Sequence, residues 1–187
     1  MASTADIRKG LCIKFNHDIY KVVEFLHVKP GKGPAFVRTK LKSLSTGRLL
    51  ENTFPSGHKI EEVRVEFRLY QSLYQDENGF HFMNTKDYNQ IYLPKTLIES
   101  PQFLKEGTNV IISFRVDDET PLSVEMPSHI VLEVIYTEPG VKGDTATNAT
   151  KSATLETGST IQVPLFIRTG DRIKVNIEDA SYMERSK

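Results

Sequence analysis

Short segments in which apolar and polar residues alternate make up most of this 187-residue sequence, and this pattern restricts its fold more than any other feature. Residues 19–25, 35–41 and 65–69 alternate or nearly alternate. A period of two residues is typical of strands with one buried and one exposed face. Similar reasoning predicts further strands over residues 69–74, 80–83, 110–116, 122–125, 130–136, 161–167 and 173–177.

Turn signals separate these strands at short intervals. Asn78-Gly79 adopts positive φ at low cost, so the segments on either side of residues 76–79 are expected to form a β-hairpin. Only residues 95–99 and their flanks predict a helix, of one or two turns, closing the mouth of a barrel. Many short strands without a helix-rich portion favour an all-β chain of small barrels over a parallel sheet covered by helices.

Three barrels of roughly 60 residues each fit the length of the chain. We place the first boundary near Arg64, where the charge changes sign, and the second near Ser128, beside Met126-Pro127, where a proline interrupts the strand pattern. The predicted domains are therefore residues 1–64, 65–128 and 129–187. Residues 143–152 contain no large apolar side chain and are expected to form a long loop in the last domain.

The net charge of zero conceals an uneven distribution along the chain. Lys and Arg number 12 against 6 Asp and Glu in residues 1–64, 5 against 10 in residues 65–128, and 7 against 8 in residues 129–187, so the net charges are +6, −5 and −1. Residues 25–50 contain six basic and no acidic residues. A surface whose charges are all positive attracts the phosphates of RNA. A surface that is only solvated by water can have the same composition.

Several kinds of site are excluded by composition. The single cysteine, Cys12, cannot form an internal disulfide, and its apolar neighbours predict a buried thiol. The five histidines are scattered singly, so we expect no metal site and no cofactor. The sequence has neither a secretion signal nor the run of roughly 18 to 20 apolar residues that spans a bilayer. We therefore expect a cytoplasmic protein that does not enter membranes.

Catalytic motifs fail on spacing or context. Residues 31–33 lack the Gly-x-x-x-x-Gly-Lys spacing of a phosphate-binding loop, and two predicted strands flank them. The acidic residues 117–119 precede Thr120-Pro121 and are interpreted as a polar hairpin turn. Residues 140–143 have the spacing of the clamp loop of KH domains, but the flanking helices are missing. We predict that the protein is not an enzyme.

Lys32 is unusual because it lies between Gly31 and Gly33, with Pro30 and Pro34 on either side. One interpretation is a flexible hairpin tip on which a lysine merely favours solubility. The other is a narrow, stiffened loop that inserts a long cationic side chain into a crevice walled by phosphates. The residues alone are consistent with both.

A resemblance to a known family favours the second interpretation. Residues 29–33, followed by residues 35–38, resemble the tip and next strand of the first, KOW-like domain of bacterial translation elongation factor P. Residues 136–145 and 81–84 resemble segments of the third and second domains of that family. The strongest match is to the family's third-domain signature, over 25 consecutive positions: Lys151-x-Ala153-x4-Gly158-x2-Ile161-x-Val163-Pro164-x-Phe166-Ile167-x2-Gly170-Asp171-x-Ile173-x-Val175.

The resemblance implies an L-shaped monomer about the size of a tRNA, with a KOW-like barrel followed by two OB-fold barrels. Such a factor binds both ribosomal subunits between the peptidyl-tRNA and exit sites and relieves stalling at consecutive prolines. Lys32 would reach toward the acceptor end of peptidyl-tRNA and act by positioning the substrates, not by catalysis. In many family members this lysine is covalently modified by a dedicated enzyme, and Pro34 leaves open whether such an enzyme recognises this chain.

The resemblance also implies roles for other individual residues. Gly143, Asp144 and Thr145 match a loop that approaches the exit-site codon of the mRNA, and Tyr182 and Arg185 match a pair near the small subunit. The tip and basic residues expected to contact RNA are Lys29, Arg38, Lys40 and Lys42.

Three alternatives stay open at this stage. A paralogue of the family would act on a different stalling sequence. A general OB-fold RNA-binding protein would need exposed aromatic side chains for base stacking, and the predicted strands present no clear platform. An enzyme would need convergent titratable residues in a pocket, and none is evident in the sequence.

Overall fold

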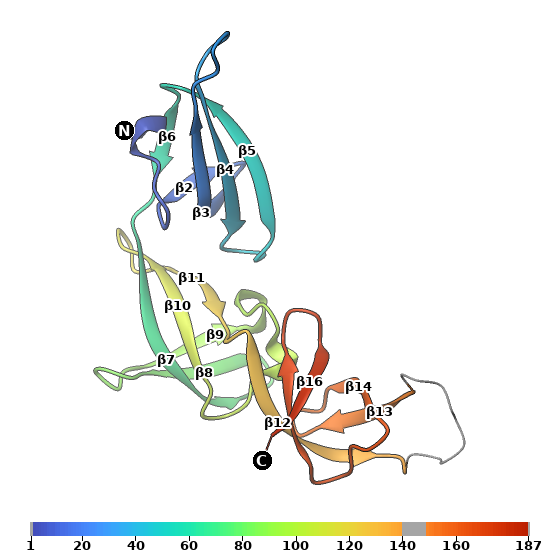
Figure 1. The fold of residues 1–187 in the computed structure, drawn as a ribbon. Helices are drawn as coiled ribbons and strands as arrows, with labels where there is room; N and C mark the ends of the chain where they lie inside the picture. Colours follow the sequence, from blue (N-terminus) through green and yellow to red (C-terminus); the bar gives the residue numbers. More distant parts are fainter. Residues whose placement is uncertain (1, 140–148, 187) are drawn as a thin grey trace. The chain divides into compact units, whose positions relative to one another are not determined.

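The computed structural model describes residues 2–139 and 149–186 and confirms the all-β prediction. The described residues form sixteen strands, three single-turn 3₁₀ helices and no α-helix, and the strands make three curled sheets (Figure 1). None of the described helices is long and apolar enough to cross a membrane. The chain divides into two compact units, Met1–Leu69 with Ile111–Glu125 and Tyr70–Val110 with Met126–Lys187. The three-domain boundaries near Arg64 and Ser128 stay a prediction.

The first sheet belongs to the first unit and has the strand order β1-β6-β2-β3-β4-β5. Its elements are β1 (Ala2–Ser3), η1 (Thr4–Asp6), β2 (Cys12–Phe15), β3 (Asp18–Val28), β4 (Phe36–Ser43), β5 (Leu49–Pro55) and β6 (Lys59–Glu62). Alternate residues of β4 are buried, as the period-two pattern predicts. The core side chains that these strands bury are Ile7, Leu11, Ile13, Val22, Val37, Leu41, Phe54 and Ile60.

Cys12 is buried, as its apolar neighbours predict. Desolvation disfavours the thiolate and raises the pKa of this thiol, and the positive charge of Lys21 only partly opposes that effect. A buried thiol with a raised pKa is a poor nucleophile, so Cys12 is a packing residue.

The second sheet has the order β11-β10-β7-β8-β9. Its elements are β7 (Val65–Gln75), β8 (Gly79–Asn84), β9 (Gln90–Pro94), β10 (Asn109–Arg115) and β11 (Pro121–Glu125). The acidic segment between β10 and β11 is a turn, as predicted: Thr120 N–H donates to Asp118 Oδ1, and Arg115 Nη1 lies 3.1 Å from Asp118 Oδ2.

The β7–β8 hairpin is confirmed, but its turn differs from the predicted mechanism. Neither Asn78 nor Gly79 has positive φ. Asp76 Oδ1 instead accepts hydrogen bonds from the Asn78 and Gly79 amides, which forms an Asx turn. Gly79 is needed for space, because a Cβ there would lie 2.3 Å from the carbonyl oxygen of Leu93 on β9.

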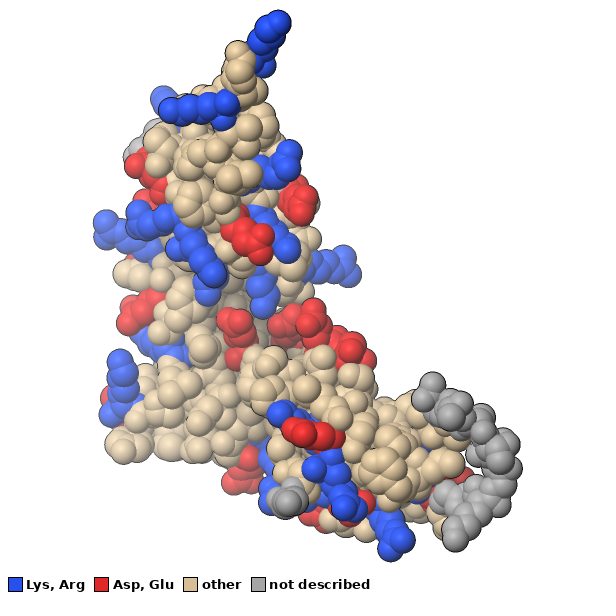
Figure 2. All heavy atoms as spheres, in the orientation of Figure 1, with Lys and Arg blue, Asp and Glu red and all other residues tan. Residues whose placement is uncertain are grey.

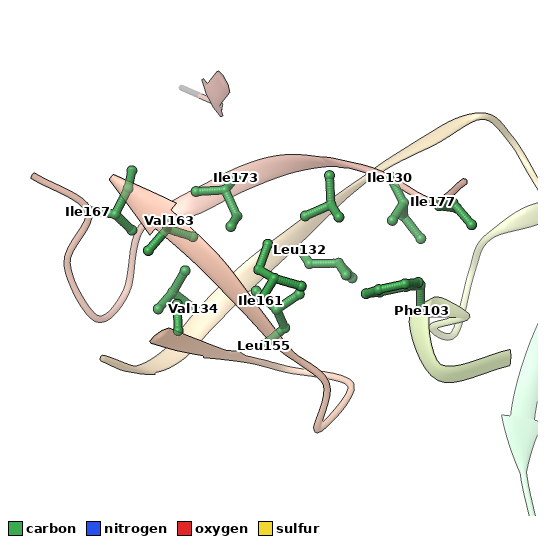
Figure 3. Close-up of a cluster of buried hydrophobic side chains, with 12 residues drawn as sticks. Phe103, Ile130, Leu132, Val134, Leu155, Ile161, Val163, Ile167, Ile173 and Ile177 are labelled. Carbon is green, nitrogen blue, oxygen red and sulfur yellow. The ribbon is translucent and has the colours of Figure 1, made fainter. Parts of the chain in front are cut away.

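The third sheet lies in the second unit and has the order β14-β13-β12-β15-β16. Its strands are β12 (His129–Thr137), β13 (Thr150–Leu155), β14 (Thr160–Pro164), β15 (Arg172–Asn176) and β16 (Ser181–Ser186). Its buried side chains converge in one core, shown in Figure 3. β13 corrects the loop predicted over residues 143–152, because residues 150–152 are strand residues paired with β14. Residues 140–148 lie outside the described part of the chain.

The short helix predicted around residues 95–99 is present as two single turns, η2 (Lys95–Leu97) and η3 (Pro101–Phe103). Phe103, at the end of η3, is buried in the same core as Ile130 and Leu132 of the third sheet (Figure 3). η3 therefore covers the core of the third sheet with an aromatic ring.

Gly79→Ala is expected to destabilise the protein by about 1 to 3 kcal/mol, because the added methyl group meets rigid backbone on β9. The measurement is the free energy of urea unfolding. Gly31→Ala is the matched control, since a Cβ at Gly31 meets no atom within 4 Å. An unchanged unfolding free energy for Gly79→Ala would contradict the close approach of the two strands.

Candidate functional site

The loop between β3 and β4 carries Lys32. The two strands pair up to Val28 and Phe36, and the joining residues extend beyond the end of the sheet (Figure 1). The base of the loop is held by the Ser56 amide, which donates to the Ala35 carbonyl oxygen at 2.9 Å. Lys32 is exposed, and its side chain forms no hydrogen bond or ion pair with any described residue. Its ammonium group is therefore available to an external partner.

The two glycines beside Lys32 have different requirements. Gly33 has a φ of +114°, a value that side-chain-bearing residues rarely adopt, so the loop conformation needs glycine there. Gly31 has no such φ, and a Cβ at Gly31 would lie in open space. The backbone turn therefore depends on Gly33. At Gly31 the lack of a side chain only keeps the tip narrow.

The predicted basic contacts on β4 lie on one face of the strand. Val37, Thr39, Leu41 and Ser43 are buried, so the residues between them point away from the core. On that outer face, Lys40 Nζ lies 3.9 Å from Glu24 Oε1, and Lys42 Nζ lies 3.6 Å from Glu125 Oε1. Such solvated pairs contribute little and can be exchanged for phosphate contacts. Arg38 is exposed and forms no ion pair with a described residue.

Lys and Arg side chains gather over the part of the molecule that contains β2 to β6, including the loop tip (Figure 2). The net charge of +6 over residues 1–64 is the origin of this surface. Lys29 is also exposed. The loop therefore presents, together with Lys29 and Arg38, a cationic surface suited to a nucleic-acid backbone.

Comparison with known proteins decides the family. Family models for elongation factor P match in chain order: the KOW-like domain over residues 3–60, the OB domain over residues 65–124 and the C-terminal domain over residues 119–185. Elongation factor P of Flavobacterium psychrophilum is 65% identical to this chain over 187 residues, and the match covers 100% of both chains. The chain belongs to the elongation factor P family.

More distant relatives agree. Elongation factor P 1 of Porphyromonas gingivalis is 54% identical over 187 residues, with 100% of both chains covered. Elongation factor P of Leifsonia xyli is 47% identical over 186 residues, covering 99% of this chain and 98% of its own. Membership in the elongation factor P family assigns this chain a role in translation elongation and confirms the family resemblance seen in the sequence.

Tyr182 and Arg185 of this elongation factor P family member lie on β16, separated by a bulge. Tyr182 pairs with Val175 and Arg185 pairs with Ile173, so β16 carries one residue more than β15 between them. Tyr182 packs against the core, and Arg185 is exposed. Gly143, Asp144 and Thr145 lie outside the described residues.

Among residues 2–139 and 149–186, no group of three His, Cys, Asp or Glu side chains is arranged to hold a metal ion. One arrangement in this elongation factor P family member escaped the sequence analysis, which found no aromatic platform. Tyr74, His81 and Tyr92 come together on β7, β8 and β9, with Tyr74 and His81 stacked at 4.3 Å between ring centroids. Only the strand register reveals the grouping.

The Asp76–His81 hydrogen bond beside these rings makes stability depend on pH. This bond, together with those from the Gly79 and Asn78 amides, lowers the pKa of Asp76 from 3.8 to about 2. A lowered native pKa stabilises the fold above about pH 3.8, and that contribution disappears as the pH falls to about 2.

Asp76→Asn is therefore expected to lower the urea midpoint at pH 7, and the deficit relative to the unmutated protein should shrink as the pH falls from about 4 toward 2. Glu77→Gln removes the adjacent carboxylate and serves as the control. A deficit that is the same at every pH would show that the ionised carboxylate of Asp76 is not the source of the stabilisation.

Proposed function

We propose that this elongation factor P family member binds both ribosomal subunits between the peptidyl-tRNA and exit sites and stimulates peptide-bond formation at consecutive prolines, with Lys32 directed to the peptidyl-transferase centre. The observation that carries the proposal is the exposed, unpartnered Lys32 at the tip of a narrow loop that extends beyond its sheet. Family membership supports the role in elongation.

The mechanism is positioning. The secondary amine and rigid ring of proline make it a slow substrate, and a favourable arrangement of the two reacting groups lowers the entropic part of the barrier. A lysine side chain fits this task, since its flexible four-carbon stem carries three N–H donors and a compact positive charge. Its donors and charge would hold the phosphate and hydroxyl groups at the acceptor end of peptidyl-tRNA. The ribosome supplies the bond-forming chemistry.

The remaining basic residues would orient the factor on RNA. Lys29 and Arg38 are exposed near the loop, and phosphate contacts of this kind position a protein without reading sequence. Lys40 and Lys42 would exchange their carboxylate partners for phosphates. At the other end of the chain, Tyr182 and Arg185 would contact the small subunit, and Gly143, Asp144 and Thr145 would approach the exit-site codon.

Covalent modification of Lys32 is part of the proposal. An exposed amine without an internal partner is accessible to a modifying enzyme, and a longer side chain would add reach or hydrogen bonds. No other cofactor is invoked. The factor would act as a monomer in the cytoplasm, where ribosomes are.

The test is the rate of synthesis through three consecutive prolines on purified ribosomes, with factor isolated from its native host. Lys32→Ala is expected to abolish most of the stimulation, because the truncated tip cannot reach the acceptor end. The control is Lys9→Ala, which removes another exposed lysine from the same compact unit and should keep full activity. Equal stimulation by Lys32→Ala and the unmutated protein would contradict the role of Lys32.

A second prediction separates the two glycines. Gly33→Ala is expected to reduce stall relief about tenfold or more, because a side chain at a φ of +114° forces the loop into another conformation and misplaces Lys32. Gly31→Ala should change the loop conformation less. Any loss of stall relief in Gly31→Ala would indicate that the ribosomal crevice that receives the loop is too narrow for an added methyl group. Stall relief by Gly33→Ala equal to that of the unmutated protein would show that this conformation is not required.

A further inference from the structure

Three aromatic side chains form a continuous row on the outer face of the β7–β8–β9 segment. The His81 ring stacks on Tyr74, with 4.3 Å between centroids and 19° between planes, and its centroid lies 5.4 Å from that of Tyr92. His81 pairs directly with Tyr92 across β8 and β9, so both point to the same side of the sheet. On β7 a bulge between Ser72 and Gln75 aims Tyr74 at His81.

The row is exposed, and core packing does not explain it. Tyr74 is 54% exposed and Tyr92 is 45% exposed. The neighbouring residues of β8, Phe80 and Phe82, point to the opposite face and are buried. Large rings in contact with water on one face are typical of a surface that docks a partner.

The central ring of the row, His81, is held in place. Asp76 Oδ2 lies 2.8 Å from His81 Nε2, while Asp76 Oδ1 accepts the Asn78 and Gly79 amides. The Tyr92 hydroxyl lies near Gly79, where an added Cβ would be 3.0 Å from it. A ring that is already fixed by a hydrogen bond loses little conformational entropy when a partner binds.

The charge around the row is negative. Asp76 is ionised at neutral pH, and Glu77 follows it in the turn. Residues 65–128 carry a net charge of −5. A phosphate backbone would be repelled here, whereas a cation would be attracted to both the carboxylates and the ring faces.

We propose that Tyr74, His81 and Tyr92, with Asp76 at their edge, form a docking surface for an arginine side chain of a basic protein segment. The planar guanidinium stacks on an exposed tyrosine ring and donates one hydrogen bond to Asp76 Oδ2, the carboxylate oxygen that does not accept the two turn amides. Arginine suits the surface better than lysine, because its flat guanidinium can stack on a ring while one of its N–H groups donates to the carboxylate. This surface does not depend on the role proposed for Lys32.

The test uses the ¹⁵N-labelled full chain titrated with a capped peptide of alternating glycine and arginine, followed by two-dimensional NMR. Saturable shifts are expected at the backbone amides of Tyr74, His81 and Tyr92. The same peptide with glutamate in place of arginine should cause none. A ten-nucleotide uridine RNA should leave these amides unshifted, and if it shifts them while the arginine peptide does not, the surface stacks nucleobases and the proposal is wrong.

Variants assign the binding to the row. Tyr92→Leu keeps an apolar side chain but removes the ring, and it is expected to weaken peptide binding about three- to tenfold. Tyr88→Leu is the matched control, because Tyr88 is 69% exposed in the turn after β8 and is not part of the row; its affinity should change less than twofold. Asp76→Asn should also weaken binding. Unchanged affinity in both Tyr92→Leu and Asp76→Asn, with folded NMR spectra, would overturn the proposal.

Discussion

The antiparallel ladder between β3 and β4 is the constraint on which the candidate functional site of this protein depends. It runs from Tyr20 paired with Ser43 to Val28 paired with Phe36. Val22, Val37 and Leu41 are almost completely buried on one face, so a slip of one residue would expose them. The hydrophobic core therefore fixes the register, and the register determines where the loop begins, which residue is at its tip and which face of β4 carries Arg38.

The distribution of charge adds a second level of organisation to a chain with no net charge. The basic N-terminal sheet presents cations where the loop leaves the ladder, which suits an RNA surface. The acidic middle segment carries the aromatic row, which suits a basic protein segment. One chain with no net charge thus carries both a cationic surface and an aromatic row flanked by carboxylates.

Much of the fold could be predicted from alternation alone, because half-buried strands record their faces in the sequence. β4 and the β7–β8 hairpin are examples. β5 was not predicted, since its leading residues Leu49 and Leu50 are exposed and its place is set by pairing with β4. The loop predicted over residues 143–152 includes the first three residues of β13, because their side chains are polar, although Ala153 and Leu155 anchor the strand in the core.

The candidate site, too, could be predicted from the sequence only in part. Two glycines around Lys32 predicted an exposed tip, but only the backbone angles distinguish Gly33, which needs positive φ, from Gly31, which does not. The grouping of the aromatic row depends on a bulge in β7, and a bulge changes which residues share a face without leaving a clear sequence signal.

We propose that the β3–β4 ladder presents position 32 to the acceptor end of peptidyl-tRNA. The most direct measurement is photo-crosslinking from a Lys32→Cys variant carrying a photoreactive maleimide, on ribosomes stalled at three prolines. Cys12 is buried and should stay unlabelled in the folded protein. The account predicts crosslinks to the 3′ end of peptidyl-tRNA and the surrounding large-subunit RNA. Ribosome-bound factor that crosslinks only to sites away from the peptidyl-transferase centre would contradict it.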